Sequence, residues 1–346
     1  MPRGRVLAVL LTVIMMLTFG LMMLAPASAG AFPGRNGKIV FDAPPDGNPA
    51  TPSQIFVMNP DGTGVQELTY SASTSNWAPV WSPDGTKIAY QSGPLGGLSI
   101  WVMNADGSGA YQVTSGYNDF FPDWSPDGSK IAFSRSGTNA GLYFVNAGGT
   151  GTPTQLTSGL EDGYPSWSPD GTKIAFARGG TAVHLFVLTV ATLSVTQLSI
   201  SGITFETMPC WSPDGSQIVF VDLTLGHPAI YVVSANGGTP NLILSGFYVW
   251  PDWSPDGTKI AYSTGVDSIH VMNADGSNPT DVTPNMPLTE APNWQRLPPV
   301  VAPVGPVGGF LEPVNKLAVF APYLALFGMV AVVAVVVAAP WKKTHN

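Results

Sequence analysis

Acidic side chains recur in successive segments of the chain, each three residues before a proline. Asp119, Asp162 and Glu206 hold this position in three successive segments, and Glu161 and Glu290 lie beside it. The aromatic residues nearby are Trp77, Phe120, Phe121, Tyr164, Tyr248 and Trp250. Carboxylates attract cations, and aromatic rings bind cations or the flat side of a small ligand. The pattern therefore predicts a ligand site for a cation, a basic peptide segment or a sugar.

A structural interpretation of the same residues stays open. Arg135 and Arg178 end the apolar runs that follow two of these acids. Exposed ion pairs and packed aromatic rings are common in folded proteins, so the arginines could pair with the acids and the rings could seal contacts between segments. In that case these side chains would stabilise the fold and bind no ligand.

The elements that position these residues are repeated. The motif Trp-Ser-Pro-Asp-Gly begins at Trp81, Trp124, Trp167, Trp211 and Trp253, at steps of 43, 43, 44 and 42 residues. After each motif come two apolar runs, a turn such as Ala105-Asp106-Gly107 and a short polar segment. The runs are rich in β-branched and aromatic residues, and the turns supply the glycine that tight hairpins need. Four short strands per repeat of this length predict a propeller blade.

The two ends of the repeat array are unequal, and this asymmetry predicts the number of blades. The first unit begins at residues 36–41 without the strand that carries proline and tryptophan, and the missing strand appears at residues 291–294 after the last unit. We therefore expect an all-β, six-bladed propeller over residues 30–296, closed by one blade that both ends of the chain share. Closure removes the open sheet edges.

The repeated Pro-x-Trp-Ser-Pro-Asp-Gly-Thr-Lys-Ile-Ala-Phe pattern resembles that of TolB-type six-bladed β-propellers. It is also similar to the propeller domain of prolyl-oligopeptidase-like peptidases. The resemblance implies protein contacts in an envelope assembly. A typical TolB carries a further domain before the propeller, and we expect none between Gly30 and Asn36, which leaves the TolB-specific partners in doubt.

The segments outside the repeats predict where the protein works. Residues 1–29 have the layout of a secretory signal peptide, with two arginines, an apolar stretch and a small-residue cleavage site; an uncleaved anchor is the alternative. Residues 317–339 are apolar and long enough to span a membrane. Residues 297–316 read as a Pro-, Gly- and Val-rich stalk. Lys342 and Lys343 place the tail, 340–346, in the cytoplasm and the propeller outside. A processed sorting signal is the alternative for the C-terminal segment.

Charge and residue usage narrow the function. Between Gly30 and Phe310 there are 9 Lys and Arg residues against 21 Asp and Glu residues, which argues against nucleic-acid binding. Cys210 is the single cysteine, so an internal disulfide is excluded. The histidines lack metal-ligand spacing, and the sequence holds no Gly-x-Ser-x-Gly elbow. We expect no catalytic residue, metal or cofactor.

These observations predict a non-catalytic, membrane-anchored extracytoplasmic module that binds a protein or an envelope polymer. The predicted ligand-binding residues at the channel mouth are Asp119, Asp162, Glu206, Glu290, Trp77, Phe120, Tyr164, Tyr248 and Trp250. The alternative is a carbohydrate-binding propeller, or a metal-dependent lyase or hydrolase that uses the acids at this mouth. A structural spacer in a surface layer is a third possibility.

Overall fold

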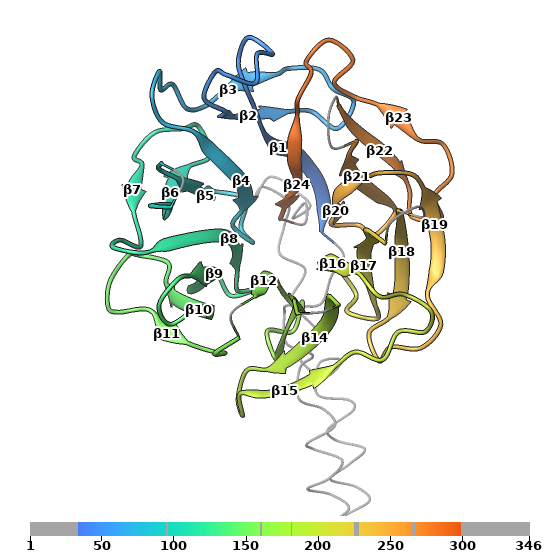
Figure 1. Cartoon of the computed structure of the whole chain (residues 1–346). Helices are drawn as coiled ribbons and strands as arrows, with labels where there is room; N and C mark the ends of the chain where they lie inside the picture. The colour runs from blue at the N-terminus through green and yellow to red at the C-terminus, as the bar shows by residue number, and fades with distance from the viewer. Residues whose placement is uncertain are drawn as a thin grey trace, which may run out of the picture. The chain divides into compact units, whose positions relative to one another are not determined.

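The computed structural model describes residues 34–298, apart from 95, 160, 181, 225–227 and 265–267. Six antiparallel sheets of four strands each stand around a central axis (Figure 1). This confirms the predicted six-bladed, all-β architecture. No helix in the described part of the chain is long and apolar enough to cross a membrane. The predicted signal peptide, most of the stalk, the membrane helix and the tail lie outside the described residues.

The blades are numbered one to six by their innermost strands. The innermost strands are β24 (Glu290–Leu297), β4 (Asn76–Trp81), β8 (Asn118–Trp124), β12 (Asp162–Trp167), β16 (Glu206–Trp211) and β20 (Val249–Trp253). The second strands are β1 (Arg35–Ala43), β5 (Lys87–Ser92), β9 (Lys130–Ser136), β13 (Lys173–Arg178), β17 (Gln217–Asp222) and β21 (Lys259–Ser263).

The two outer positions of each blade follow in the same order. The third strands are β2 (Gln54–Met58), β6 (Ser99–Asn104), β10 (Gly141–Asn146), β14 (His184–Thr189), β18 (Ala229–Ser234) and β22 (Ile269–Asn273). The outermost strands are β3 (Gln66–Glu67), β7 (Tyr111–Gln112), β11 (Thr154–Gln155), β15 (Ser194–Gln197), β19 (Asn241–Ser245) and β23 (Thr280–Asp281).

Blade one is built from both ends of the described chain, as predicted. The last strand, β24, pairs antiparallel with the first, β1, so that Trp294 lies opposite Ile39 and Leu297 opposite Arg35. Figure 1 shows the two strands side by side near the axis. The ring is therefore closed by hydrogen bonds between the two ends of the described chain, and blade one has four strands like the other five.

The apolar core is distributed between blades. One cluster joins Val40 and Ile55 of blade one to Trp81, Ile88 and Met103 of blade two, and the other blade junctions hold similar clusters. The second strands run through these clusters with their central residues fully buried. Because both faces of a blade pack on neighbours, one blade alone would expose its core, and the ring folds as a unit.

The Ser-Pro-Asp-Gly turn that follows each innermost strand is a local structure. In blade three the Ser125 hydroxyl donates a hydrogen bond to Asp127 Oδ1 at 2.6 Å, and Ser129 N donates to the same oxygen at 3.0 Å. These bonds lower the pKa of Asp127. Gly128 follows with φ of 69°, a conformation that glycine adopts without strain. The aspartates of this repeated motif are thus explained by turn geometry.

The turns define two faces of the propeller. We call the end at which the innermost strands begin the entry face, and the end that carries the Ser-Pro-Asp-Gly turns the turn face. Since β24 begins at Glu290 and ends at Leu297 opposite Arg35, the described chain both starts and finishes at the turn face. Neither end of the described chain lies at the entry face.

Candidate binding site at the channel mouth

Every innermost strand has the same backbone irregularity close to the entry face. The pairing register shifts two residues into the strand, for example between Trp77 and Val80 in blade two. The residue before the proline adopts a positive φ in all six blades: Ala78, Phe121, Tyr164, Met208, Trp250 and Ala291. Non-glycine residues rarely adopt this conformation, and bulges of this kind redirect a side chain.

Three of these residues bring large aromatic rings together. The ring centroids of Phe121 and Tyr164 are 4.2 Å apart, those of Phe121 and Trp250 are 5.2 Å apart, and those of Tyr164 and Trp250 are 5.4 Å apart. The residues come from blades three, four and six, so their rings meet at the axis. With the neighbouring prolines they line a cavity of about 120 Å³. We call Phe121, Tyr164 and Trp250 the aromatic cluster.

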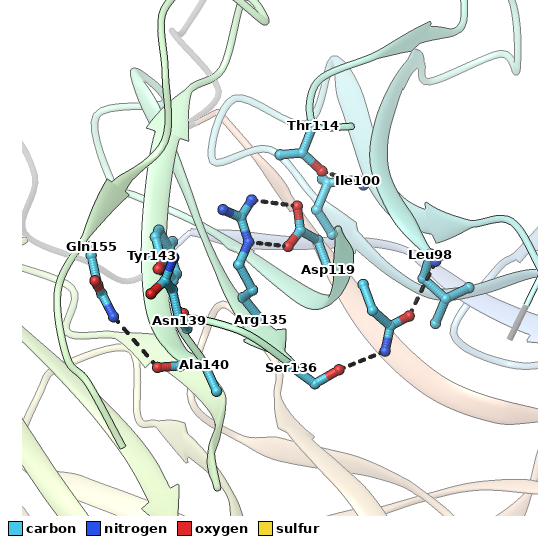
Figure 2. Close-up of polar contacts among 11 residues, drawn as sticks. Leu98, Ile100, Thr114, Asp119, Arg135, Ser136, Asn139, Ala140, Tyr143 and Gln155 are labelled. Atoms are coloured by element: carbon cyan, nitrogen blue, oxygen red, sulfur yellow. Dashed lines mark hydrogen bonds and ion pairs between the residues drawn. The ribbon is translucent and has the colours of Figure 1, made fainter. Parts of the chain in front are cut away.

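Two of the predicted acids are buried and form ion pairs with arginines of their own blades. Arg135 donates from Nε to Asp119 Oδ1 at 2.6 Å and from Nη2 to Oδ2 at 2.8 Å (Figure 2). The Asp119 side chain is 0% exposed and that of Arg135 is 6% exposed. Asp162 is likewise held by Arg178, with 2.7 Å from Nη2 to Oδ2. At these two positions the structure shows the pairing with arginine that the sequence left open.

The other two acids lack an arginine. Glu206 is buried, accepts a hydrogen bond from Leu185 N at 2.9 Å and lies 3.4 Å from His184 Nδ1. Burial raises its pKa. Glu290 is half-buried and its cross-strand neighbour is Asp42; the Glu290 carboxylate has no ion pair or hydrogen bond with any described residue. Burial raises the pKa of Glu290 as well.

A ring of polar side chains lines the channel deeper than the aromatic cluster. It is formed by the residues directly before the repeated tryptophans, except in blade two, where this residue is the apolar Val80. Asp123, Ser166, Asp252 and Asn293 each accept the backbone N–H of the tryptophan in the next blade. Asp123 Oδ2 bonds to Trp167 N at 2.7 Å, Asp252 Oδ2 to Trp294 N at 2.7 Å, and Asn293 Oδ1 to Trp81 N at 2.8 Å. The Cys210 thiol lies 3.3 Å from Asp252 Oδ1. These bonds link neighbouring blades around the axis.

A model of the TolB β-propeller domain matches residues 23–183 and 162–298. The chain belongs to the TolB β-propeller family. Its fold resembles that of TolB from Acinetobacter baumannii, with a TM-score of 0.65 and 22% identity over 75% of this chain and 66% of that one. A putative TolB from Agrobacterium tumefaciens gives a TM-score of 0.58 and 19% identity over 77% of this chain and 99% of that one.

A similar fold occurs in a protein that is not named a TolB. Hydrazine synthase of Kuenenia stuttgartiensis gives a TM-score of 0.62 and 18% identity, over 76% of this chain and 47% of that one. The sequence has no significant match among curated proteins. Because propellers of one shape serve different tasks, the function of this TolB-type propeller has to be argued from its own side chains.

The structure brings together only part of the predicted site. Tyr164 and Trp250 meet in the aromatic cluster, and Phe120 packs edge-on against Phe121 with ring centroids 4.9 Å apart. Tyr248 packs against Tyr262 instead, and Trp77 lies half-buried at the start of β4. The four acids lie in separate blades. Ligand binding by these nine residues remains a prediction.

The polar ring was not expected from the sequence, although its position in the repeat was visible. Burial raises the pKa of Asp123 and that of Asp252 to about 7. In the unfolded chain an aspartate titrates near pH 3.9. Between about pH 4 and pH 7 the folded propeller therefore holds protons that the unfolded chain releases. Its stability should fall as the pH rises through this range and then level off.

We expect Asp123→Asn and Asp252→Asn to stabilise this TolB-type propeller at pH 8 and to have little effect near pH 4. An asparagine already accepts the equivalent bond from Trp81 N at position 293. The raised pKa corresponds to about 4 kcal/mol per carboxyl. Water in the channel, to which both side chains are partly exposed, should reduce the gain to about 1–3 kcal/mol. Urea unfolding between pH 4 and pH 8 measures it.

Asp127→Asn is the control, because hydrogen bonds lower the pKa of Asp127. Its substitution should cost stability at neutral pH and less at low pH, the opposite direction. A loss of stability in Asp123→Asn at pH 8, or an effect independent of pH, would contradict the expected ionisation of the channel carboxyls.

Proposed function

We propose that this TolB-type propeller is a non-catalytic, extracytoplasmic binding module whose entry face contacts a protein partner. The observation that carries the proposal is the position of its exposed aromatic side chains. Four are strongly exposed: Tyr70 (77%), Tyr117 (45%), Phe205 (39%) and Phe247 (55%). All four lie in loops that lead from an outermost strand into the next innermost strand.

These loops surround the aromatic cluster on one face. Aromatic residues are enriched in protein interfaces, and apolar side chains gathered on one surface indicate a contact site. The turn face differs, because its repeated loops carry aspartate, glycine and serine or threonine that bond to one another. A protein partner is therefore favoured over an ion or a small metabolite, and the entry face over the turn face.

Export and anchoring are part of the proposal, and they rest on the sequence of residues 1–29 and 317–339. The geometry of the propeller is compatible with them, since the described chain ends at the turn face beside its own beginning; Arg35 Nε donates to the Pro298 carbonyl at 3.4 Å. A tether that follows residue 298 would leave the entry face unobstructed. The partner would then be a protein or polymer of the cell envelope.

Paired substitutions test the proposed face. A photo-crosslinking residue is placed at position 117, and crosslinks to a partner are measured in intact membranes. We expect the double substitution Phe205→Ala and Phe247→Ala to reduce this crosslinking about tenfold or more. Leu193→Ala with Leu242→Ala is the matched control, because both leucines are about as exposed (49% and 50%) but lie away from the entry-face loops, at a turn between outer strands and on an outermost strand. It should leave the crosslink intact.

The other outcomes discriminate between functions. A crosslink that survives the phenylalanine pair, or one obtained equally from a residue at position 216 on the turn face, would refute the proposed face. If no protein crosslinks and a glycan array is bound instead, the module would be a carbohydrate-binding propeller.

A further inference from the structure

The channel mouth is divided into two unequal halves. The six redirected side chains follow one another around the ring in blade order: Ala291, Ala78, Phe121, Tyr164, Met208 and Trp250. Phe121 and Trp250 come from opposite blades, three and six, and their rings are in contact across the axis. They separate a half filled by Tyr164 and Met208 from a half that contains only two alanines.

We infer that the half of the mouth beside Ala78 and Ala291 receives an apolar side chain of a partner peptide, flanked by a lysine or arginine that pairs with Glu290. This inference rests on the proposed protein-binding function and specifies the chemistry of the segment that is bound. The alanine side of the mouth is called the alanine slot below.

Backbone geometry does not account for the alanines. Ala78 and Ala291 have φ of 47° and 46°, and Phe121 and Trp250 have φ of 55° and 57° in equivalent positions. The same bulge therefore carries large side chains in four blades and the smallest ones in two adjacent blades. The cavity of about 120 Å³ is lined at its mouth by these residues and the prolines that follow them, and at its floor by the residues directly before the repeated tryptophans. Its volume is on the scale of one apolar side chain. Such a side chain would contact the Phe121 and Trp250 rings and would be buried away from water.

The charge beside the slot has no counterpart within the described part of the chain. Glu290 directly precedes Ala291, and its cross-strand neighbour is another acid, Asp42. Asp42 is 3% exposed and accepts the backbone N–H of Ala78 at 2.9 Å. Burial, and then the charge of Glu290, raise the pKa of Asp42. The arginines that neutralise Asp119 and Asp162 have no equivalent here, so a cationic group of the partner would relieve the repulsion between the two acids.

A selection from random seven-residue peptides displayed on phage tests the inference with purified full-length protein in detergent. The selected peptides should share an apolar residue next to lysine or arginine. Ala78→Phe, which places in blade two the residue that blade three carries, should weaken their binding about tenfold or more. Glu290→Gln should weaken it about threefold at low salt and have no effect at about 0.5 M salt.

Controls keep the outcomes distinct. If the Ala78→Phe variant has a lower melting temperature than the wild type, Ala78→Met, which copies the residue of blade five, takes its place. Leu242→Ala is the negative control and should bind the peptides as the wild type does. Normal binding by a folded Ala78→Phe or Ala78→Met variant would overturn the slot and leave the proposed function standing. Peptides without cationic residues, unaffected by Glu290→Gln, would overturn the role of Glu290. If no peptide binds the wild type, the slot fails, whereas the proposed function is decided by the crosslinking of the entry face in intact membranes.

Discussion

A chain that ends at residue 289 should not fold, whereas one that ends at residue 298 should melt as the full-length protein does. The shorter chain lacks β24, the innermost strand of blade one. Trp294, which is 5% exposed, packs with Ile39 and Phe41 of its own blade and with Ala261 of blade six. Truncating one such tryptophan costs about 3–5 kcal/mol.

Two links between blades disappear with the same strand. Asp252 Oδ2 loses the Trp294 N–H, and Trp81 N loses its acceptor, the side-chain Oδ1 of Asn293. A typical domain has about 5–15 kcal/mol of stability in total, so the combined loss should exceed what the ring can tolerate. Tryptophan fluorescence during urea titration measures this. A chain ending at 289 with a wild-type unfolding midpoint would contradict closure by β24.

Arg135→Leu should lower the free energy of unfolding by about 3–5 kcal/mol, because it leaves the Asp119 carboxylate buried without a charged partner. Arg135 also lies between aromatic rings, with its guanidinium carbon 3.9 Å from the Tyr117 ring centroid and 4.4 Å from that of Tyr143. Urea unfolding at pH 7 gives the value.

Two further variants separate the charge from the packing. Asp119→Leu combined with Arg135→Leu should recover much of the stability, since the pair is then replaced by apolar side chains. Arg178→Leu should cost less, about 1–3 kcal/mol, because the Arg178 side chain is 31% exposed and water screens its pair with Asp162. Equal losses for Arg135→Leu and Arg178→Leu would show that burial of the pair is not the cause.

The repeat made the fold predictable. Each Trp-Ser-Pro-Asp-Gly unit specifies its turn through bonds between residues two to five apart, as between Ser125, Asp127 and Lys130. The strand missing before residue 36 and present near residue 294 predicted the shared blade. The pairing of β24 with β1 confirms that inference. The turn motif is local, and the shared blade follows from counting strands, so the fold could be predicted without knowing which side chains are in contact.

The candidate site was predictable only in outline. Its position at the mouth followed from the repeat, and Tyr164 and Trp250 were among the residues expected there. The sequence did not show that Asp119 and Asp162 are neutralised within their blades, because the partner arginine is defined by the strand register. The sequence also did not predict that Phe121 and Trp250 adopt a positive φ that redirects their side chains, since a residue before proline normally favours an extended backbone.

The sequence by itself determined the number of blades, the strands in each, the turn chemistry and the acidic character of this propeller, because these properties depend on neighbouring residues and on composition. The tertiary structure decided which side chains meet. Phe121, Tyr164 and Trp250 are separated by 43 and 86 residues along the chain, and only ring closure brings them to one axis. The same closure encloses Asp123 and Asp252 in the channel and raises their pKa values to about 7, because burial depends on all six blades at once.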